Sequence, residues 1–379
     1  MTERTSITVN APAKINLTFE ILGLLPDGYH EVRTLMQTVS LFDELTFEIS
    51  SAKEPSLSID LVTAGGARSP AAGEGQGQFP LGDTNLIARA IRLFLSSIDR
   101  PRALKVDVTV AKHIPIGAGL AGGSGNAAAA LVALNQYFGG PLGDDAMAEL
   151  AAKLGADVPF CLQGGRRLGL GRGDILDSTP QGAPFDDSLF VDGGASAGAG
   201  KAGATAGEES DRAPIQIMHF VLAKTRHLSL ATPWVYQSFD QKLAQQEILS
   251  LADKLRDRGV DALPCDYAQA NLQAGNLKEA LRAFGNDFEQ VVFPHYQQLK
   301  EIKQRFLACG ALACHMTGSG PTIYAVAESA AHATELIEKY KESEAEASNI
   351  ACAAKYDQID LYAVRSIDVG ARVVQVGKI

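Results

Sequence analysis

One glycine-rich stretch, residues 114–126, constrains this chain more than any other feature. It reads Ile-Pro-Ile-Gly-Ala-Gly-Leu-Ala-Gly-Gly-Ser-Gly-Asn, and an alanine-rich run over 127–138 follows it directly. Apolar residues in that run recur every three or four positions, which predicts a helix with one buried face after the loop. Backbone N–H groups of a glycine loop at a helix N-terminus approach anions closely. The stretch therefore predicts a phosphate site, and the alternative is a flexible connector.

Chain length and composition predict two domains. The chain has 379 residues, of which 46% are hydrophobic and 21% charged, which is typical of a globular protein too long for one core. A glycine- and alanine-rich stretch over 186–213 cannot bury a core and predicts a disordered insert. We therefore expect an N-terminal domain over 1–185 and a C-terminal domain over 214–379.

Charge and cysteine usage limit the partners and the compartment. A formal net charge of -10 argues against nucleic acid as the main partner. No apolar run approaches membrane length, and the first residues lack the apolar core of a signal peptide. The five cysteines form no CxxC pair, which favours reduced thiols over disulfides or a zinc site. These features predict a cytoplasmic protein that does not bind membranes.

Residue periodicity places several candidate side chains. Residues 7–23 alternate as a strand with Lys14 and Asn16 on one face. Pro26-Asp-Gly predicts a turn, with Tyr29 and His30 at its far edge. An exposed loop is expected over 64–78. Strands are expected over 41–49, 57–62 and 104–110, and helices over 85–97 and 144–154.

Two common glycine-loop classes do not fit this stretch. Residues 117–122 match G-x-G-x-x-G, but the acids at 144 and 145 open another helix instead of ending a second strand, so a dinucleotide fold is disfavoured. Gly200-Lys201 is followed by alanine in low-complexity sequence, and no glycine stands five residues earlier, so it is not a P-loop.

The remaining pattern resembles the second motif of the GHMP kinases, a superfamily of small-molecule kinases. Four further blocks resemble one family within it, the 4-diphosphocytidyl-2-C-methyl-D-erythritol kinases: residues 11–16 (Ala-Pro-Ala-Lys-Ile-Asn), 26–30 (Pro-Asp-Gly-Tyr-His), 154–160 (Leu-Gly-Ala-Asp-Val-Pro-Phe) and 317–321 (Thr-Gly-Ser-Gly-Pro). The five blocks occur in family order and span most of the chain. The insert over 186–213 is a departure from the family pattern.

The resemblance implies an α+β fold of two domains with the active site between them. The N-terminal domain would contain a left-handed βαβ unit, although such crossovers are almost always right-handed, and the C-terminal domain would be ferredoxin-like. The implied reaction is ATP-dependent phosphorylation of the 2-hydroxyl of 4-diphosphocytidyl-2-C-methyl-D-erythritol, in non-mevalonate isoprenoid biosynthesis. The alternatives are another GHMP kinase, of homoserine or mevalonate type, and a non-catalytic nucleotide-binding module.

The same resemblance assigns two catalytic residues. Asp157 would accept the proton of the substrate hydroxyl, whereas the sequence alone is equally compatible with a helix N-cap. Lys14 would lie beside Asp157 and stabilise developing charge, whereas the sequence alone favours an ordinary edge-strand lysine.

The ATP site implied by the family lies around the glycine loop, and magnesium is expected with the triphosphate. Family members often carry a hydroxyl where this chain has Gly125, so no residue is assigned as a metal ligand. The residues expected to contact ATP are Asn85, Pro115, Gly117, Gly119, Leu120, Gly122, Gly123, Ser124, Gly125 and Asn126.

The substrate site implied by the family recognises cytosine through Tyr29 and His30. An aromatic face stacks on a base and an imidazole hydrogen-bonds its edge; without the family match the pair would be a turn tyrosine and a solvated histidine. The other residues expected at the substrate are Asn16, Thr232, Gly318 and Ser319, although residues 317–321 alone also fit a simple turn between strands. We expect a small-molecule substrate and a monomer or weak homodimer.

Overall fold

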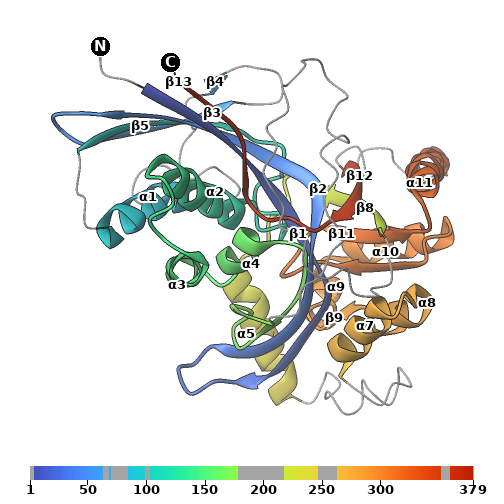
Figure 1. Cartoon of the computed structure of the whole chain (residues 1–379). Helices are drawn as coiled ribbons and strands as arrows, with labels where there is room; N and C mark the ends of the chain where they lie inside the picture. The colour runs from blue at the N-terminus through green and yellow to red at the C-terminus, as the bar shows by residue number, and fades with distance from the viewer. Residues whose placement is uncertain are drawn as a thin grey trace.

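Two long antiparallel strands form the spine of the molecule. The computed structural model describes residues 4–62, 68–69, 84–98, 103–177, 217–245, 263–350 and 359–378. Strands β1 (Arg4–Leu24) and β2 (His30–Ser51) pair along nearly their whole length and run from one end of the molecule to the other (Figure 1). The strand expected over 7–23 is confirmed, but the one expected over 41–49 already begins at His30. Residues 34–39 are buried on both faces, so the alternation that marks a half-exposed strand is lost there.

The N-terminal half has four helices on one side of the sheet, two of them in direct contact with its strands. Strand β5 (Leu104–Ala111) pairs antiparallel with β2, and β3 (Ser56–Val62) pairs parallel with β5. Helix α1 (Leu86–Ser97) joins β3 to β5, so the βαβ connection is present and its left hand stays a prediction. The remaining elements of this half are α2 (Gly122–Tyr137), α3 (Asp144–Leu154), α4 (Val158–Gln163), β4 (Arg68–Ser69), β6 (Arg166–Leu170) and β7 (Ile175–Leu176).

The buried face of helix α2 consists mainly of alanine and leucine. Four consecutive alanines, residues 127–130, are fully buried between α1 and β1. Small side chains allow the helix to approach the sheet closely, and this approach carries its N-terminus into the middle of the molecule. The helices expected over 85–97 and 144–154 correspond to α1 and α3 and are confirmed.

The C-terminal half is ferredoxin-like, as expected. Its four strands, β8 (His219–Thr225), β10 (Ala313–Met316), β11 (Ile323–Ala327) and β12 (Ile359–Ile367), lie in the order β10-β11-β8-β12 with antiparallel neighbours. Helices lead from β8 to β10 and from β11 to β12. They and a short strand are α5 (Thr232–Ala244), α7 (Pro264–Gln273), α8 (Leu277–Ala280), the 3-10 helix η3 (Leu281–Ala283), β9 (Gly285–Asn286), α9 (Glu289–His295), α10 (Gln297–Ala308) and α11 (Ala330–Ile350).

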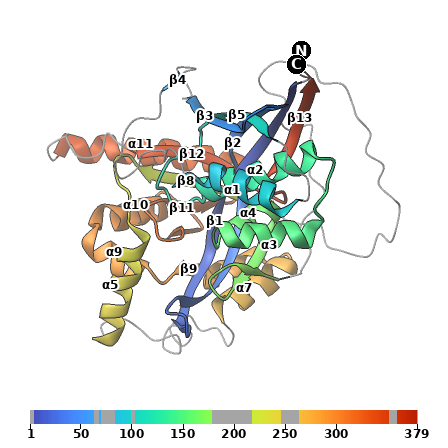
Figure 2. The ribbon, with the colours of Figure 1, turned by 90° about the vertical axis from the view of Figure 1, so that its left-hand side faces the viewer.

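Strand pairing joins the two halves into one continuous sheet. Strand β12 pairs with the middle of β2, and the last strand, β13 (Arg372–Lys378), returns to pair with β1. The two chain ends therefore lie side by side (Figure 2). The domain boundaries expected at 185 and 214 and the insert over 186–213 lie outside the described residues, as does the loop expected over 64–78 apart from β4. Among the described helices, none is long and apolar enough to cross a membrane.

A largely buried carboxylate joins two helices of the C-terminal half to the end of β10. Glu289 on α9 accepts hydrogen bonds from Lys303 on α10 (2.6 Å) and from the backbone N–H of Met316 (2.8 Å), and it lies 3.4 Å from His315. Burial alone would raise the pKa of Glu289, but His315 and Lys303 outweigh it, so the pKa lies below its ordinary value.

We predict that Glu289→Gln lowers the free energy of unfolding at pH 7 by about 1–3 kcal/mol. Because the folded-state pKa is lowered, the stabilisation is present above the unfolded pKa and is lost as pH falls through the folded value. Urea unfolding at pH 7, 5 and 4 should therefore show a weaker acid dependence in the variant than in the unmodified chain. Equal acid dependence in both proteins would contradict this role, and Glu335→Gln, at an exposed helix pair, is the control.

Candidate active site

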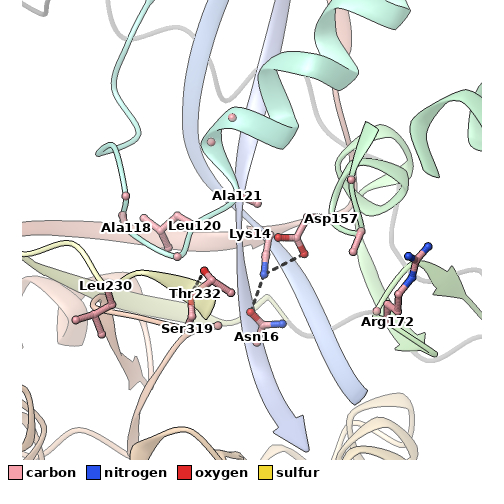
Figure 3. Close-up of a pocket in the computed structure, with 18 of the residues that line it drawn as sticks. Lys14, Asn16, Ala118, Leu120, Ala121, Asp157, Arg172, Leu230, Thr232 and Ser319 are labelled. Atoms are coloured by element: carbon pink, nitrogen blue, oxygen red, sulfur yellow. Dashed lines mark hydrogen bonds and ion pairs between the residues drawn. The ribbon is translucent and has the colours of Figure 1, made fainter. Parts of the chain in front are cut away.

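A cavity of about 1070 Å³ lies where the two halves meet, bounded by β1, the loop before α2, the start of α4 and the loop after β10. Figure 3 shows side chains from these separate elements converging on it. The predicted site residues that line the cavity are Lys14, Asn16, Tyr29, His30, Asn85, Pro115, Gly117, Gly119, Leu120, Gly122, Gly123, Asn126, Asp157, Thr232, Gly318 and Ser319. Ser124 and Gly125 belong to the same stretch but do not line it.

The expected boundary between glycine loop and helix is wrong by more than one turn. Helix α2 begins at Gly122 instead of after the loop, and its first hydrogen bond runs from the N–H of Gly125 to the carbonyl of Ala121. The N–H groups of residues 122–124 precede that bond and have no partner within the helix. Glycines carry no side-chain periodicity, so the sequence pattern could not reveal this first turn. The helix N-terminus itself, with its partial positive charge, borders the cavity.

The loop before α2 needs glycine where it touches the C-terminal half. Gly119 has φ +75°, and a Cβ there would lie 2.8 Å from the carbonyl oxygen of Gly320 and 2.9 Å from that of Thr317. Ala121, the N-cap residue, holds a left-handed conformation with φ 56°. A non-glycine residue in this region is uncommon and concentrates at functional sites. The backbone of the loop is therefore shaped by its contact with the loop after β10.

A lysine and an aspartate meet at the centre of the cavity. The Lys14 ammonium lies 3.4 Å from Asp157 Oδ1 and donates to Asn16 Oδ1 at 2.7 Å (Figure 3). The Lys14 side chain is 4% exposed, whereas that of Asp157 is 40% exposed. Asp157 does occupy the N-cap position of α4, but its side chain makes no capping hydrogen bond. Asp157 thus occupies the N-cap position and also lies beside Lys14. Its carboxylate contacts Lys14 and makes no capping hydrogen bond to α4.

Asn16 is held rigidly by both halves of the molecule. Its amide nitrogen donates to Thr34 Oγ1 at 2.7 Å, and its backbone N–H donates to Thr317 Oγ1 at 2.9 Å. Asn286 in turn donates to the carbonyls of Met316 and Gly318, both at 2.8 Å, which fixes the loop over 317–321. Polar networks that are satisfied in this way define one side-chain arrangement.

Thr232 and Ser319 close the cavity from the C-terminal half. Their hydroxyl groups lie 2.9 Å apart, so the start of α5 is joined to the loop after β10 (Figure 3). Asn85 serves as the N-cap of α1, where its Oδ1 accepts from the N–H of Ile87 at 2.8 Å. That capping bond was not expected, and it fixes Asn85 at the cavity wall.

Tyr29 and His30 lie together at one end of the cavity. Tyr29 is 58% exposed and has the Arg172 guanidinium 5.0 Å from its ring centroid. His30 Nε2 lies 2.7 Å from Asp240 Oδ1, and the His30 ring lies 4.5 Å from that of Tyr236. The His30 imidazole is therefore hydrogen-bonded to Asp240 and largely shielded from solvent. Burial and the charge of Asp157 raise the pKa of Tyr236 to about 12, so this tyrosine lies within electrostatic range of the Asp157 carboxylate.

Sequence reasoning missed the residues that complete this end. Arg172, Tyr236 and Asp240 come from the β6–β7 turn and from α5, which only the tertiary fold brings to Tyr29 and His30. No local signal distinguishes them from ordinary turn and helix residues.

Sequence reasoning also missed a buried ion pair behind the glycine loop. Asp43 is fully buried and accepts from Lys112 and from the backbone N–H groups of His113 and Ile114, both at 2.9 Å. Asn126 donates to the same carboxylate at 2.9 Å once its amide is oriented to satisfy its neighbours. Burial lowers the pKa of Lys112, and Asp43 offsets only part of that effect. The pair places a lysine at the N-terminus of α2.

Family models match both halves of the chain. The GHMP kinases N terminal domain matches residues 85–165, and the GHMP kinases C terminal domain matches residues 268–346. Two relatives are named 4-diphosphocytidyl-2-C-methyl-D-erythritol kinase: one from Synechocystis sp. is 32% identical, covering 89% of this chain and 92% of the relative, and one from Cyanothece sp. is 36% identical, covering 87% and 90%.

Solved structures show the same fold. A crystal structure of 4-(cytidine 5'-diphospho)-2C-methyl-D-erythritol kinase superposes with a TM-score of 0.62 at 24% identity, over 95% of this chain and 100% of that one. Homoserine kinase from Cytophaga hutchinsonii superposes with a TM-score of 0.65 at 18% identity, over 97% of each chain. The fold is thus common to kinases of different substrates and does not by itself select one.

We predict opposite effects of alanine at two glycines of this stretch. Gly125 lies inside α2, and its added Cβ would meet Ala11 Cβ and the Pro12 carbonyl oxygen at an ordinary 3.5 Å. Gly125→Ala should therefore raise the free energy of unfolding by about 0.5–1 kcal/mol. Gly119→Ala should lower it by more than about 1 kcal/mol, because the backbone is left-handed and the space is filled. Thermal or urea unfolding measures both, and equal destabilisation by the two substitutions would contradict the account of the loop.

Proposed function

The chain belongs to the GHMP kinase family, and from that premise we propose that it transfers the γ-phosphoryl group of ATP to the 2-hydroxyl of 4-diphosphocytidyl-2-C-methyl-D-erythritol. Membership of a kinase family implies the use of ATP and a small-molecule acceptor. The choice of acceptor rests on the names of the relatives at 32% and 36% identity. The observation that carries the chemistry is the Lys14–Asp157 pair in a cavity that also contains a glycine loop.

The glycine loop and the N-terminus of α2 form the phosphate end of the proposed site. Phosphoryl transfer demands positioning and stabilisation of charge, and both are supplied here by backbone N–H groups and by Lys112. The Lys112 ammonium also donates to the carbonyl of Ile114 at 2.7 Å, so the lysine is held against the loop.

Magnesium fits this end of the cavity as a companion of the triphosphate. Within the described residues no group of three or more histidine, cysteine or acidic side chains could enclose a metal ion. Magnesium with ATP commonly relies on phosphate oxygens and water, with one or two carboxylates at most. Of the two acidic side chains that line the cavity, Asp240 contacts His30, so Asp157 would be the carboxylate available to the ion. The ion would screen the negative charge of the triphosphate.

Asp157 is the proposed general base. A carboxylate that makes no capping bond and is partly exposed can accept the proton of an incoming hydroxyl. The Lys14 ammonium, 3.4 Å from Asp157, lies where it would stabilise the negative charge that develops on the attacking oxygen. Because Asn16 and Thr34 hold the ammonium in place, little reorganisation is needed during transfer.

The opposite end of the cavity is suited to a pyrimidine base. Tyr29 and Tyr236 offer aromatic faces, and His30 offers a ring nitrogen to a base edge. Arg172, beside Tyr29, adds positive charge near a diphosphate-bearing substrate. Homoserine and mevalonate carry no base, so this end of the cavity favours the cytidyl substrate over those acceptors.

Two broader properties complete the proposal. Cys161, Cys265, Cys309 and Cys314 are free thiols, which is the state expected in a reducing compartment and supports a cytoplasmic location. The chain is further proposed to act on a small-molecule substrate as a monomer or weak homodimer.

We predict that Asp157→Asn lowers kcat by roughly 10²- to 10⁴-fold, the usual contribution of a general base. The KM for ATP should stay within about threefold, because the phosphate end is untouched. Coupled measurement of ADP formation tests this, with Asp145→Asn, an exposed carboxylate of α3, as the control. Unchanged turnover in Asp157→Asn would rule out the assignment, and a chain that binds nucleotide without turnover would be a non-catalytic module.

A second prediction concerns the base. Tyr29→Ala should raise the KM for the cytidyl substrate roughly 5- to 100-fold, because stacking on an aromatic ring contributes about 1–3 kcal/mol per base. The KM for ATP should change little. Leu24→Ala, at an exposed position of the same hairpin, is the matched control. Equal increases for both substrates would argue against a base-binding role.

A further inference from the structure

The contact between His30 and Asp240 constrains more than the position of the histidine. His30 begins β2, and Asp240 lies on α5, 210 residues further along the chain. Their atoms Nε2 and Oδ1 are 2.7 Å apart, and the His30 ring packs at 4.5 Å against Tyr236, one turn earlier on α5. The side chain of His30 is only 11% exposed.

This contact selects one tautomer of the neutral imidazole. A neutral imidazole carries hydrogen on one ring nitrogen and accepts on the other. An ionised carboxylate can only accept, so the hydrogen of His30 resides on Nε2. Nδ1 then carries a lone pair. It has no hydrogen bond to any residue in the part of the chain that the structure describes.

We propose that Asp240 is a specificity-determining positioning residue, which holds His30 in the Nε2–H tautomer so that Nδ1 accepts a hydrogen bond from the exocyclic amino group of cytosine. The inference rests on the proposed function. Cytosine presents an amino donor at the position where uracil presents a carbonyl acceptor. A uracil oxygen facing the Nδ1 lone pair would find two acceptors opposed, and neither would be satisfied. Asp240 thus lets the site distinguish cytidine from uridine substrates.

The same contact also has a purely structural interpretation. The contact joins the β1–β2 hairpin to α5 across the cavity. A link that only stabilises the cavity wall would change kcat/KM for all substrates by the same factor. The two interpretations differ in one measurable quantity, the ratio of kcat/KM for the cytidyl substrate to that for its uridyl analogue.

Steady-state kinetics with both substrates tests the proposal. The unmodified enzyme should prefer the cytidyl substrate by roughly 10- to 100-fold, the range expected for one directional hydrogen bond. Asp240→Leu should reduce that preference to less than about threefold, because either tautomer can then form. Asp240→Asn preserves the shape and one acceptor and should retain part of the preference. Asp360→Ala, which removes an exposed carboxylate paired with Arg226, should leave the ratio unchanged.

A lower kcat/KM for both substrates with an unchanged ratio in Asp240→Leu and Asp240→Asn would overturn the proposal in favour of the structural tie. An unmodified enzyme that accepts both substrates equally would overturn it as well.

The tautomer can be observed without any turnover. Long-range ¹H–¹⁵N spectra of the free protein separate protonated from unprotonated imidazole nitrogens, and His30→Gln identifies the signals of this ring. We expect an unprotonated Nδ1 and a protonated Nε2, changed in Asp240→Leu. The reverse tautomer, or hydrogen on both nitrogens, would overturn the proposal even if the enzyme is active. If the cytidyl substrate is not turned over at all, the proposed function fails, and the spectra still decide the tautomer.

Discussion

Buried Lys14 faces half-exposed Asp157 at the centre of the molecule. Several separate elements of the fold hold these two groups in position. Lys14 lies in the middle of β1, where an ammonium group is expensive to bury unless it is paired. Asp157 supplies the opposite charge from the start of α4, and Asn16 supplies an acceptor two residues along the same strand. Gly155 ends α3, and Pro159 in the first turn of α4 favours a helix start at Val158, so Asp157 precedes the helix and its carboxylate lies beside β1.

The paired strands β1 and β2 explain why the site lies between the two halves. Each strand contributes to the core of the N-terminal half at one end and to that of the C-terminal half at the other. Residues at their midpoint therefore face both α2 and the loop after β10. Hydrogen bonds from Asn16 to Thr34 and Thr317, and the close approach of Gly119 to that loop, make the central wall of the cavity one rigid unit. A rigid wall suits a reaction that depends on positioning.

Much of this site could be predicted from sequence because its motifs are local. The glycine loop, the Lys14–Asn16 face and the block around Asp157 are each short, and all three line one cavity as expected. Three physical causes explain the features that the sequence did not reveal. Glycines leave no periodic pattern, so the first turn of α2 was hidden, and a strand buried on both faces shows no alternation, so the first half of β2 was hidden. Asp43, Arg172, Tyr236 and Asp240 act through contacts between distant segments, and no local spacing records such contacts. The roles assigned to individual residues stay predictions.

The central claim is that this cavity combines a phosphate end, a Lys14–Asp157 pair and a base-binding end into one kinase. The most direct measurement is ADP release by the purified chain with ATP and magnesium, comparing 4-diphosphocytidyl-2-C-methyl-D-erythritol with homoserine and mevalonate. We expect turnover with the cytidyl compound alone. Turnover with homoserine or mevalonate at a comparable rate would contradict the base-binding end, and ATP binding without turnover of any of the three would contradict the kinase itself.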